Sequence, residues 1–366
     1  MNKAIRAGLV CAAMLFIGCA GTEADDTARQ DPLEATRFWL RQNPPDGTNR
    51  ADRRERMAVL QRACDQLSVE DYALYARAWS TNAAQCDQAE QTHPALGYLR
   101  DATLEAIDEI RHTRVEKGVA VWLIYNMGHV FKTPTACFGI DLSGRRVERL
   151  APELDVLLNT HEHKDHYSEP LIHAMLQRGK PVVTRWFPGT TVINQATNMV
   201  FGGIRVRIDI GDHHYRNPKQ LNNMLMFEVS CGADAGNAVI YHCGDNSNID
   251  KIAPSQPLDL LIVHVSVGLP VAETIRRVNP RMAFPAHLLE LGHSPHPPHA
   301  WRWSYDYAFD TVKEIPAAKT AVLTWGERWL LPGTQNTTPL CFPAETKKRK
   351  TINNRPTRPS TRTVPA

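Results

Sequence analysis

The 366-residue sequence lacks the signatures of several common catalytic classes. It has no Gly-x-Ser-x-Gly, no P-loop and no Gly-x-Gly-x-x-Gly, which argues against a serine nucleophile elbow, a Walker-type phosphate cradle and a dinucleotide fingerprint. Its eight cysteines include no Cys-x-x-Cys pair, so a cysteine-based zinc site is not expected. A catalytic nucleophile would have to come from other chemistry.

The chain also lacks an N-terminal apolar run long enough to span a bilayer. Residues 7–17 are apolar and follow two basic residues, which is typical of a signal-peptide core. The run ends before Cys19 in a stretch that resembles a bacterial lipobox, although Phe16 replaces the usual Leu and ordinary signal-peptidase cleavage stays an alternative. Ala20 rather than Asp follows the cysteine, as in sorting to the outer membrane. We expect residues 1–19 to be a signal peptide, with Cys19 lipidated and the protein anchored in the bacterial outer membrane facing the periplasm.

Acidic residues are missing from the basic end of the chain. The net charge is +3, but residues 347–362 carry seven Lys and Arg side chains and no acid, and subtracting these seven charges leaves −4 for the rest. The segment 345–366, rich in Thr, Pro and Arg, is therefore expected to be a disordered tail. Because the remainder is not basic, we expect no specific nucleic-acid binding.

Hydrophobic periodicity divides the remaining chain into two parts. Residues 20–33 are polar and read as a linker, and apolar residues recur at helical spacing over residues 34–114, which predicts a helical extension. Over residues 117–335 strand-like runs alternate with helix-like ones, the last strand being expected at residues 320–325. This stretch predicts one large α/β domain.

Six cysteines lie beyond the signal, in a compartment that permits disulfides. Cys64 could pair with Cys86, and Cys231 with Cys243. Free buried thiols are the equal alternative, because connectivity does not follow from spacing.

Four side chains with metal-ligand chemistry crowd into six residues after a buried strand-like run, residues 154–158. His161 and His163 lie two apart in an extended stretch, so they point the same way and can share one ion. Asp165 and His166 turn toward a neighbouring position. A solvated polar loop would account for any one of these histidines but not for all four residues at this spacing. Imidazole and carboxylate ligands suit zinc best, with iron and manganese as alternatives.

The spacing from His161 to His166 resembles the H-x-H-x-D-H signature of the metallo-β-lactamase-fold hydrolases. The resemblance implies a four-layer αββα sandwich with two metal ions at strand ends along one edge. It also implies a third His on the first metal, an Asp that bridges both metals and a last His on the second metal. Candidates follow strand-like runs in the right order, and the implied metal ligands are His161, His163, Asp165, His166, His214, Asp245 and His287, with Asp165 and Asp245 as catalytic residues.

The histidine that completes the first metal site is ambiguous, because His213 and His214 are adjacent and face opposite ways at a strand end. We favour His214 and keep His213 as the alternative. His242 and His264 lie inside strand-like runs, where burial in the core is the simpler account. His293 follows His287 in a His-rich stretch and is the candidate for a substrate contact.

The resemblance implies a hydrolase in which two divalent ions, zinc first and manganese or iron as alternatives, hold a bridging hydroxide that Asp245 orients. Within the family the chain is similar to the subgroup of L-ascorbate-6-phosphate lactonase and N-acyl-phosphatidylethanolamine phospholipase D. The substrate expected from that likeness is a small-molecule or lipid-like phosphodiester, lactone or related ester. The alternatives are a non-catalytic metal-binding envelope lipoprotein and a β-lactamase-type amide hydrolase. The second is disfavoured because β-lactamases commonly lack the bridging Asp.

Overall fold

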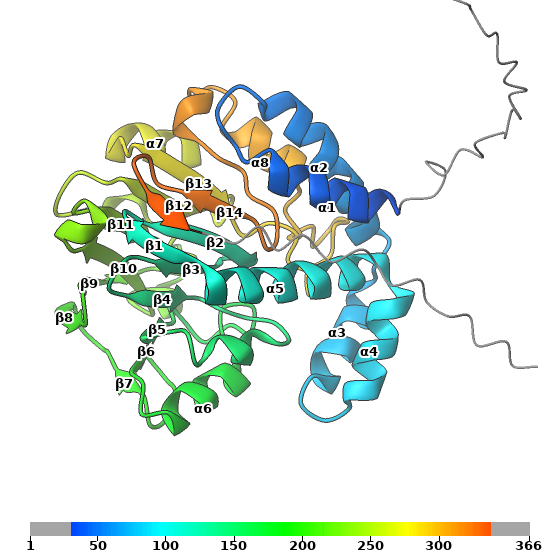
Figure 1. Cartoon of the computed structure of the whole chain (residues 1–366), viewed down its shortest axis with the longest axis horizontal. Helices are drawn as coiled ribbons and strands as arrows, with labels where there is room; N and C mark the ends of the chain where they lie inside the picture. Colours follow the sequence, from blue (N-terminus) through cyan, green and yellow to red (C-terminus); the bar gives the residue numbers. More distant parts are fainter. Residues whose placement is uncertain (1–30, 215, 338–366) are drawn as a thin grey trace, which may run out of the picture.

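The computed structural model describes residues 31–214 and 216–337 (Figure 1). The expectations about Cys19, the signal peptide and the basic tail concern residues outside this part of the chain. Among the helices formed by the described residues, none has the length and apolar character needed to cross a membrane.

Five helices form the N-terminal part, which confirms the predicted helical extension. Side-chain caps begin three of them: the side-chain oxygens of Asp31, Ser68 and Asn82 accept backbone N–H groups from the first turns of α1, α3 and α4. The five helices are α1 (Pro32–Gln42), α2 (Arg50–Asp65), α3 (Val69–Ala78), α4 (Ala83–Thr92) and α5 (Pro94–His112).

The strands of the described chain form two large sheets and a two-stranded pair, β1 with β15. The first sheet has seven strands in the order β14-β2-β3-β4-β5-β6-β7, and the second has six in the order β13-β12-β11-β10-β9-β8. The strands are β1 (Arg114–Lys117), β2 (Ala120–Tyr125), β3 (Gly128–Lys132), β4 (Cys137–Ile140), β5 (Val156–Leu158), β6 (Val182–Thr184), β7 (Thr191–Val192), β8 (Thr197–Phe201), β9 (Ile204–Gly211), β10 (Met224–Cys231), β11 (Val239–His242), β12 (Leu260–His264), β13 (Met282–Ala286), β14 (Arg328–Leu330) and β15 (Gln335–Thr337).

The two sheets pack face to face, and helices cover their outer faces. One buried cluster joins the sheets, with Phe131 and Phe138 from the first and Phe227 and Ile262 from the second. The outer face of the first sheet packs against α5 and α6 (Glu169–Gln177), and that of the second against α7 (Val271–Val278). Figure 1 shows α6 and α7 on opposite sides of the sheets. This layer order confirms the expected αββα sandwich.

Strand direction explains why distant residues meet at one edge. In the second sheet β11, β12 and β13 are parallel, and β9 runs in the same direction because β10 is antiparallel to both β9 and β11. The carboxyl ends of β9, β11, β12 and β13 therefore share one edge of that sheet. The predicted ligands after β9, β11 and β13 are placed there by topology alone.

The strand expected at residues 320–325 is wrong. These residues are buried, but the segment makes only an isolated bridge, between Thr320 and Ala283. It ends in a tight turn at Gly326, whose φ of 75° suits glycine, and the buried carboxylate of Glu327 accepts the backbone N–H of Thr324. A side chain rather than a neighbouring strand satisfies that group, so the ladder forms later, in β14.

The helical extension is tied to the sandwich through a buried ion pair. Arg53 in α2 lies 2.7 Å from Glu327, and both side chains are almost fully buried. The same guanidinium also donates to the carbonyls of Asn43 and Val322. The α2 helix further contacts α8 (Tyr305–Thr311), which packs with the extension in one apolar cluster.

The cysteines within the described residues are free thiols, so neither suggested disulfide is formed. All are buried, and burial raises the pKa of the Cys137 and Cys231 thiols to about 12. The thiols therefore pack as small apolar side chains. The five are Cys64, Cys86, Cys137, Cys231 and Cys243.

Candidate metal centre

The H-x-H-x-D-H segment forms the turn between β5 and α6, where the sequence predicted it. Asn159 follows β5 directly, and its side-chain amide donates to the carbonyl of His166 across the turn at 2.9 Å. The backbone N–H of His166 donates to the carbonyl of His163, also at 2.9 Å. The turn then ends at Ser168, whose hydroxyl caps α6. The segment is thus a closed, hydrogen-bonded turn rather than a loose loop.

One group of candidate ligands gathers around the two histidines of the motif. A donor atom from each of His161, His163, His213 and Asp245 lies within 4.8 Å of the other three. The Oδ2 atom of Asp245 lies 3.7 Å from Nε2 of His161 and 3.5 Å from Nε2 of His213. Three imidazoles and one carboxylate at this spacing form a donor set suited to zinc.

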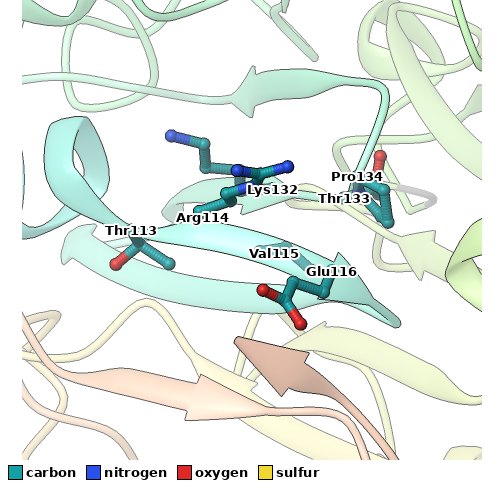
Figure 2. A pocket seen from close by; sticks show the side chains of 7 residues that line it. All are labelled: Thr113, Arg114, Val115, Glu116, Lys132, Thr133 and Pro134. Carbon is teal, nitrogen blue, oxygen red and sulfur yellow. The ribbon is translucent and has the colours of Figure 1, made fainter. Parts of the chain in front are cut away.

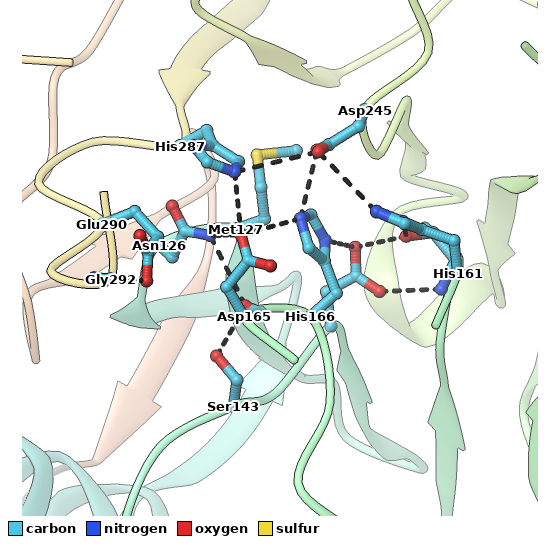
Figure 3. A network of polar contacts seen from close by, with 12 residues as sticks. Asn126, Met127, Ser143, His161, Asp165, His166, Asp245, His287, Glu290 and Gly292 are labelled. Atoms are coloured by element: carbon cyan, nitrogen blue, oxygen red, sulfur yellow. Dashed lines mark hydrogen bonds and ion pairs between the residues drawn. The ribbon is translucent and has the colours of Figure 1, made fainter. Parts of the chain in front are cut away.

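A second group lies beside the first and is built from Asp165, His166 and His287 (Figure 3). Nε2 of His287 lies 3.0 Å from Oδ2 of Asp165, and Nε2 of His166 lies 3.4 Å from the same oxygen. Asp245 reaches this group as well, with Oδ1 at 3.2 Å from Nε2 of His166. Its carboxylate therefore lies between the two groups, as the resemblance implied for a bridging Asp.

The structure corrects the preference for His214. His213 turns inward and its ring contacts those of His161 and His163, whereas the side chain of His214 is exposed. The reason lies in the preceding residue: Asp212 is buried and held by Lys251 and other partners, so the turn after β9 is fixed with its next side chain facing the site. The alternative kept for this position, His213, takes the place.

Sequence analysis missed Asp141, which lies behind both groups. Its Oδ2 atom accepts from the Thr160 hydroxyl at 2.8 Å and contacts Nδ1 of His166 at 2.9 Å. The Thr160 oxygen in turn contacts Nδ1 of His161 at 2.9 Å. The Asp141 carboxylate can only accept hydrogen bonds, and the Thr160 hydroxyl already donates its hydrogen to Asp141. Nδ1 of His161 and Nδ1 of His166 must therefore each carry a hydrogen. In the neutral imidazoles of His161 and His166, Nε2 is therefore left with a free lone pair facing the centre. The signal that could have identified Asp141 from the sequence was its position, as an acidic residue directly after the strand-like run 137–140.

Unpartnered buried atoms support occupation of these groups by cations. Among the described residues, the buried nitrogens or oxygens without a hydrogen-bond partner include Nε2 of His161 and of His166, both ring nitrogens of His213, and Oδ1 of Asp245. Leaving such groups buried and unsatisfied costs about 1–3 kcal/mol each. Ligation to a metal ion would satisfy them together, so the residues present fit a divalent cation.

The electrostatics of the two donor groups also favour bound cations. Burial lowers the pKa of His161 well below its ordinary value, so this ring is neutral and ready to bind metal. Burial alone would raise the pKa of Asp245, but the imidazoles of His166 and His287, which carry positive charge while no cation is bound, outweigh it and hold that pKa well below its usual range. The carboxyl of Asp165 behaves in the same way. Ionised carboxylates in a buried site need positive charge, which bound cations supply.

Backbone geometry around the centre is unusual. Asn126, Asp141 and His287 have φ values of 55°, 53° and 67°, in the left-handed region that non-glycine residues rarely occupy. Gly244, with φ of 52°, precedes Asp245, and a Cβ there would lie 2.9 Å from Thr160 and closer still to a methionine. Glycine is therefore required for the close approach of these turns.

The two buried strand histidines differ in what their rings face. In His242 Nδ1 accepts the backbone N–H of Gly244, and Nε2 contacts the carbonyl of Met127 at 3.0 Å, so both nitrogens are satisfied in the core. In His264 Nδ1 accepts the N–H of Ser266, which leaves the proton on Nε2. Unlike His242, His264 groups with Asp245 and His287 and packs its ring 4.2 Å from that of His287. Its place at the end of β12, matching that of Asp245 after β11, was the overlooked signal.

The candidate substrate residue His293 lies against the centre. Its ring stacks with that of His287 at 6.2 Å, and Nδ1 lies 3.1 Å from the buried carboxylate of Glu290. Tyr125 also hydrogen-bonds Glu290, at 3.3 Å. His129 is different: it is buried among aromatic rings, contacts the carbonyl of Met127, and belongs to none of the donor groups.

A pocket of about 580 Å³ lies elsewhere, between the β1 segment and the end of β3 (Figure 2). It is lined by residues 113–116 and 132–134, and no candidate ligand is among them. The chemistry of the candidate centre therefore lies outside this pocket.

Comparisons with solved structures find proteins of similar architecture. The chain is similar to a possible metal-dependent hydrolase from Veillonella parvula, with 15% identity, 59% of this chain and 100% of that chain covered, and a TM-score of 0.47. It is also similar to a metallo hydrolase from Ignicoccus hospitalis, with 15% identity, coverage of 60% and 98%, and a TM-score of 0.44. An isothiocyanate hydrolase from Delia radicum gut bacteria shares 14% identity, with coverage of 57% and 98% and a TM-score of 0.41.

No curated protein matches the chain. A family comparison gives a match that spans the site. Residues 122–287 match the Beta-lactamase superfamily domain. This stretch contains all of the candidate ligands, which run from His161 to His287.

Proposed function

We propose that this protein is a hydrolase that depends on two divalent metal ions and acts on a phosphodiester, a lactone or a related ester. The observation that carries the proposal is the pair of adjacent donor groups that share Asp245, with ring nitrogens of His161 and His166 buried and unpartnered. A scaffold protein would have no need for two such groups side by side. Zinc is the first choice for a set dominated by imidazole, and manganese and iron are the alternatives.

When bound, such ions lower the pKa of a coordinated water toward neutrality and polarise the oxygen of the scissile group. The chain's own residues arrange that chemistry. Asp141 fixes the protonation of His161 and, directly, of His166, so that both present a lone pair. Asp245 lies between the two donor groups and would help to hold a cation in each of them. The Nε2–H of His264 is a neutral donor beside Asp245, able to hydrogen-bond an oxygen on the substrate or on the leaving group.

The test combines metal analysis with a substrate screen on the full chain. Purified protein is expected to hold close to two divalent ions and to hydrolyse model phosphodiesters or lactones, whereas hydrolysis of β-lactams alone would favour the amide-hydrolase alternative. His166→Ala should lose metal and activity together. The matched control is His173→Ala, because His173 is an exposed histidine on α6 whose contacts, with Glu169 and the ring of Phe187, involve no candidate ligand.

Two outcomes would contradict the proposal. Protein that binds no metal even after reconstitution would remove the site assignment. Protein that binds two ions but hydrolyses none of the three classes would favour the non-catalytic metal-binding alternative.

A separate proposal concerns location, and it rests on the sequence alone. We propose that Cys19 is lipidated and anchors the protein in the bacterial outer membrane on the periplasmic side, where a lipid-like ester would be within reach. Cys19→Ser should release the protein from the membrane fraction or leave its N-terminus unprocessed. Mass spectrometry that finds a mature N-terminus elsewhere, without an acyl chain, would contradict the anchor and leave the hydrolase proposal intact.

A further inference from the structure

A row of aromatic rings leads outward from the candidate metal centre. It starts at His287, against which His293 stacks with a ring separation of 6.2 Å and an angle of 20°. Trp301 meets His293 edge-on at 5.9 Å, and His299 meets Trp301 at 5.6 Å. The rings therefore form a continuous path from a candidate ligand to the surface.

The outer end of this row is open to solvent. Trp301 is 54% exposed, which is unusual for the largest apolar side chain. Tyr307 is 40% exposed, so two of the three exposed Phe, Tyr and Trp side chains in the described ranges lie in this one region, the third being Phe38 on α1. Exposed aromatic rings gathered beside a reactive site are a usual mark of ligand binding.

Tyr307 connects to the centre by a second path. Its hydroxyl hydrogen-bonds that of Ser266 at 2.8 Å, and the backbone N–H of Ser266 is the group that fixes His264. Trp303 packs against Tyr307 with ring centres 5.0 Å apart. Two aromatic arms thus border the centre, one next to His287 and one next to His264.

The segment that carries Trp301 is held in place by the buried side chain of the next residue. Arg302, the residue after Trp301, is buried and donates to the carbonyls of Leu291 at 2.7 Å and Cys64 at 2.7 Å. It also donates to the carbonyl of Leu67, just beyond the C-terminal end of α2, where the helix dipole favours a cation. The helical extension therefore holds the base of the segment that carries Trp301.

The exposed apolar surface of this row is the indole of Trp301. The ring of His293 is partly buried, and its Nδ1 lies 3.1 Å from the Glu290 carboxylate. The cations that fit the adjacent centre would repel a cationic ligand group. A flat, uncharged group avoids this repulsion and can stack on the exposed indole.

We propose that Trp301 and His293 form a subsite for an aryl or similarly flat, uncharged group of the substrate, placed outward from the bond that reacts. The identity of that bond rests on the proposed function. The subsite itself is a binding surface, and its affinity for a ligand is measurable without turnover.

The experiment compares two ligands on the metal-loaded full chain by titration calorimetry. Naphthylmethylphosphonate carries a flat ring, and methylphosphonate carries the same anionic head without it. The wild type should bind the naphthyl ligand more tightly. Trp301→Ala should weaken binding of the naphthyl ligand by roughly five- to tenfold, the size expected for loss of one ring contact, and leave methylphosphonate binding unchanged.

Two further variants sharpen the comparison. Trp301→Phe keeps a ring and should retain most of the preference. Phe38→Ala removes an exposed ring from α1 and should leave the preference at the wild-type value. Thermal unfolding of each variant checks that the fold is retained, and Trp301→Leu replaces the alanine variant if that one unfolds.

Two results would overturn the subsite: a wild type that binds both phosphonates equally, or a Trp301→Ala variant with an undiminished naphthyl preference. Failure of the proposed function looks different. A protein that hydrolyses no ester but still loses its naphthyl preference on Trp301→Ala would keep the subsite and lose the reaction.

Discussion

Asp141 belongs to neither donor group, yet it contacts His166 directly and His161 through Thr160. In Asp141→Asn the side-chain amide can donate a hydrogen bond, whereas the carboxylate could only accept one. The substitution therefore disturbs which nitrogen carries the hydrogen in the rings of His161 and His166. We expect both ions to bind about 10–100-fold more weakly, which is the usual cost of losing such a partner. Competition with a chromophoric chelator measures the two affinities.

The matched variant is Thr160→Val, which has nearly the same shape; it removes the hydroxyl contacts with Asp141 and His161 but keeps the direct contact between Asp141 and His166. It should weaken the ion held by the His161 group and spare the other. Equal losses of both ions in Thr160→Val, or none in Asp141→Asn, would contradict this account of how the rings are oriented.

His213 and His214 provide a direct test of the corrected ligand. Because His213 faces Asp245 and the side chain of His214 is exposed, His213→Ala should remove one ion and at least 100-fold of the turnover, whereas His214→Ala should stay near the wild type. Elemental analysis and hydrolysis rates measure both effects. The reverse order of damage would restore the preference drawn from the sequence.

Part of the site could be predicted from the sequence because the residues concerned are close together in the chain. The placement of His161 to His166 in one turn follows from spacing and from the flanking strand and helix signals. The choice between His213 and His214 depends instead on how Lys251 holds Asp212, a contact between residues 39 positions apart. The end of β12 was the signal available for His264, but its contact with the ring of His287, 23 positions later, depends on the pairing of β12 with β13.

At the scale of elements, the segment from Leu288 to Trp303 is shaped by its contacts with the helical extension. Arg302→Met keeps the packing of the stem but removes the donors to the carbonyls of Leu291, Cys64 and Leu67. We expect the free energy of unfolding to fall by roughly 3 kcal/mol, since buried carbonyls are left without partners. We also expect faster proteolytic cleavage near Trp301.

Arg302→Lys is the companion variant. A lysine can satisfy some of the carbonyls at the end of α2 as a point charge, so it should recover part of the lost stability. Urea unfolding and limited proteolysis measure both changes. Wild-type values in Arg302→Met would show that the segment does not depend on this clamp.

The α/β class followed from strands alternating with helices, and the order of layers was implied by the family resemblance, but individual strands near the end of the chain could not be placed in either way. Residues 320–325 are as apolar as a buried strand, and the structure buries them without pairing them. The deciding contact is the side chain of Glu327, which takes a backbone group that a strand would offer to its neighbour. Apolar periodicity reports burial, and pairing depends on partners far away in the sequence.

For the whole molecule, Glu290 gives stability a pH dependence. Burial, followed by the charge of Asp165, raises the pKa of this carboxyl from 4.5 to about 7. A group whose pKa is raised in the folded state contributes stability that is complete below the unfolded pKa and is lost as pH rises through the folded one. Between about pH 4.5 and 7 the metal-free protein should therefore lose up to roughly 3 kcal/mol through this group.

Glu290→Gln should remove that loss, so the variant and the wild type should diverge as pH rises across this window. Urea unfolding of chelator-treated protein at a series of pH values measures the difference. Glu169→Gln, which changes an exposed carboxyl at the start of α6, should follow the wild-type curve. Parallel curves for Glu290→Gln and the wild type would contradict the shifted pKa.

The candidate ligands follow β5, β9, β11 and β13, so they span both sheets and 127 positions of the chain, counted from His161 to His287 inclusive. As the chain emerges from the ribosome, the last of them appears only after most of the sandwich has been made. Ion capture is therefore a late event that cannot guide early steps, and it reports whether the two sheets have docked. A variant that keeps its helices and strands but loosens the contact between the sheets should release its ions first. In any destabilised variant, the metal content would thus show whether the two sheets are still docked against each other.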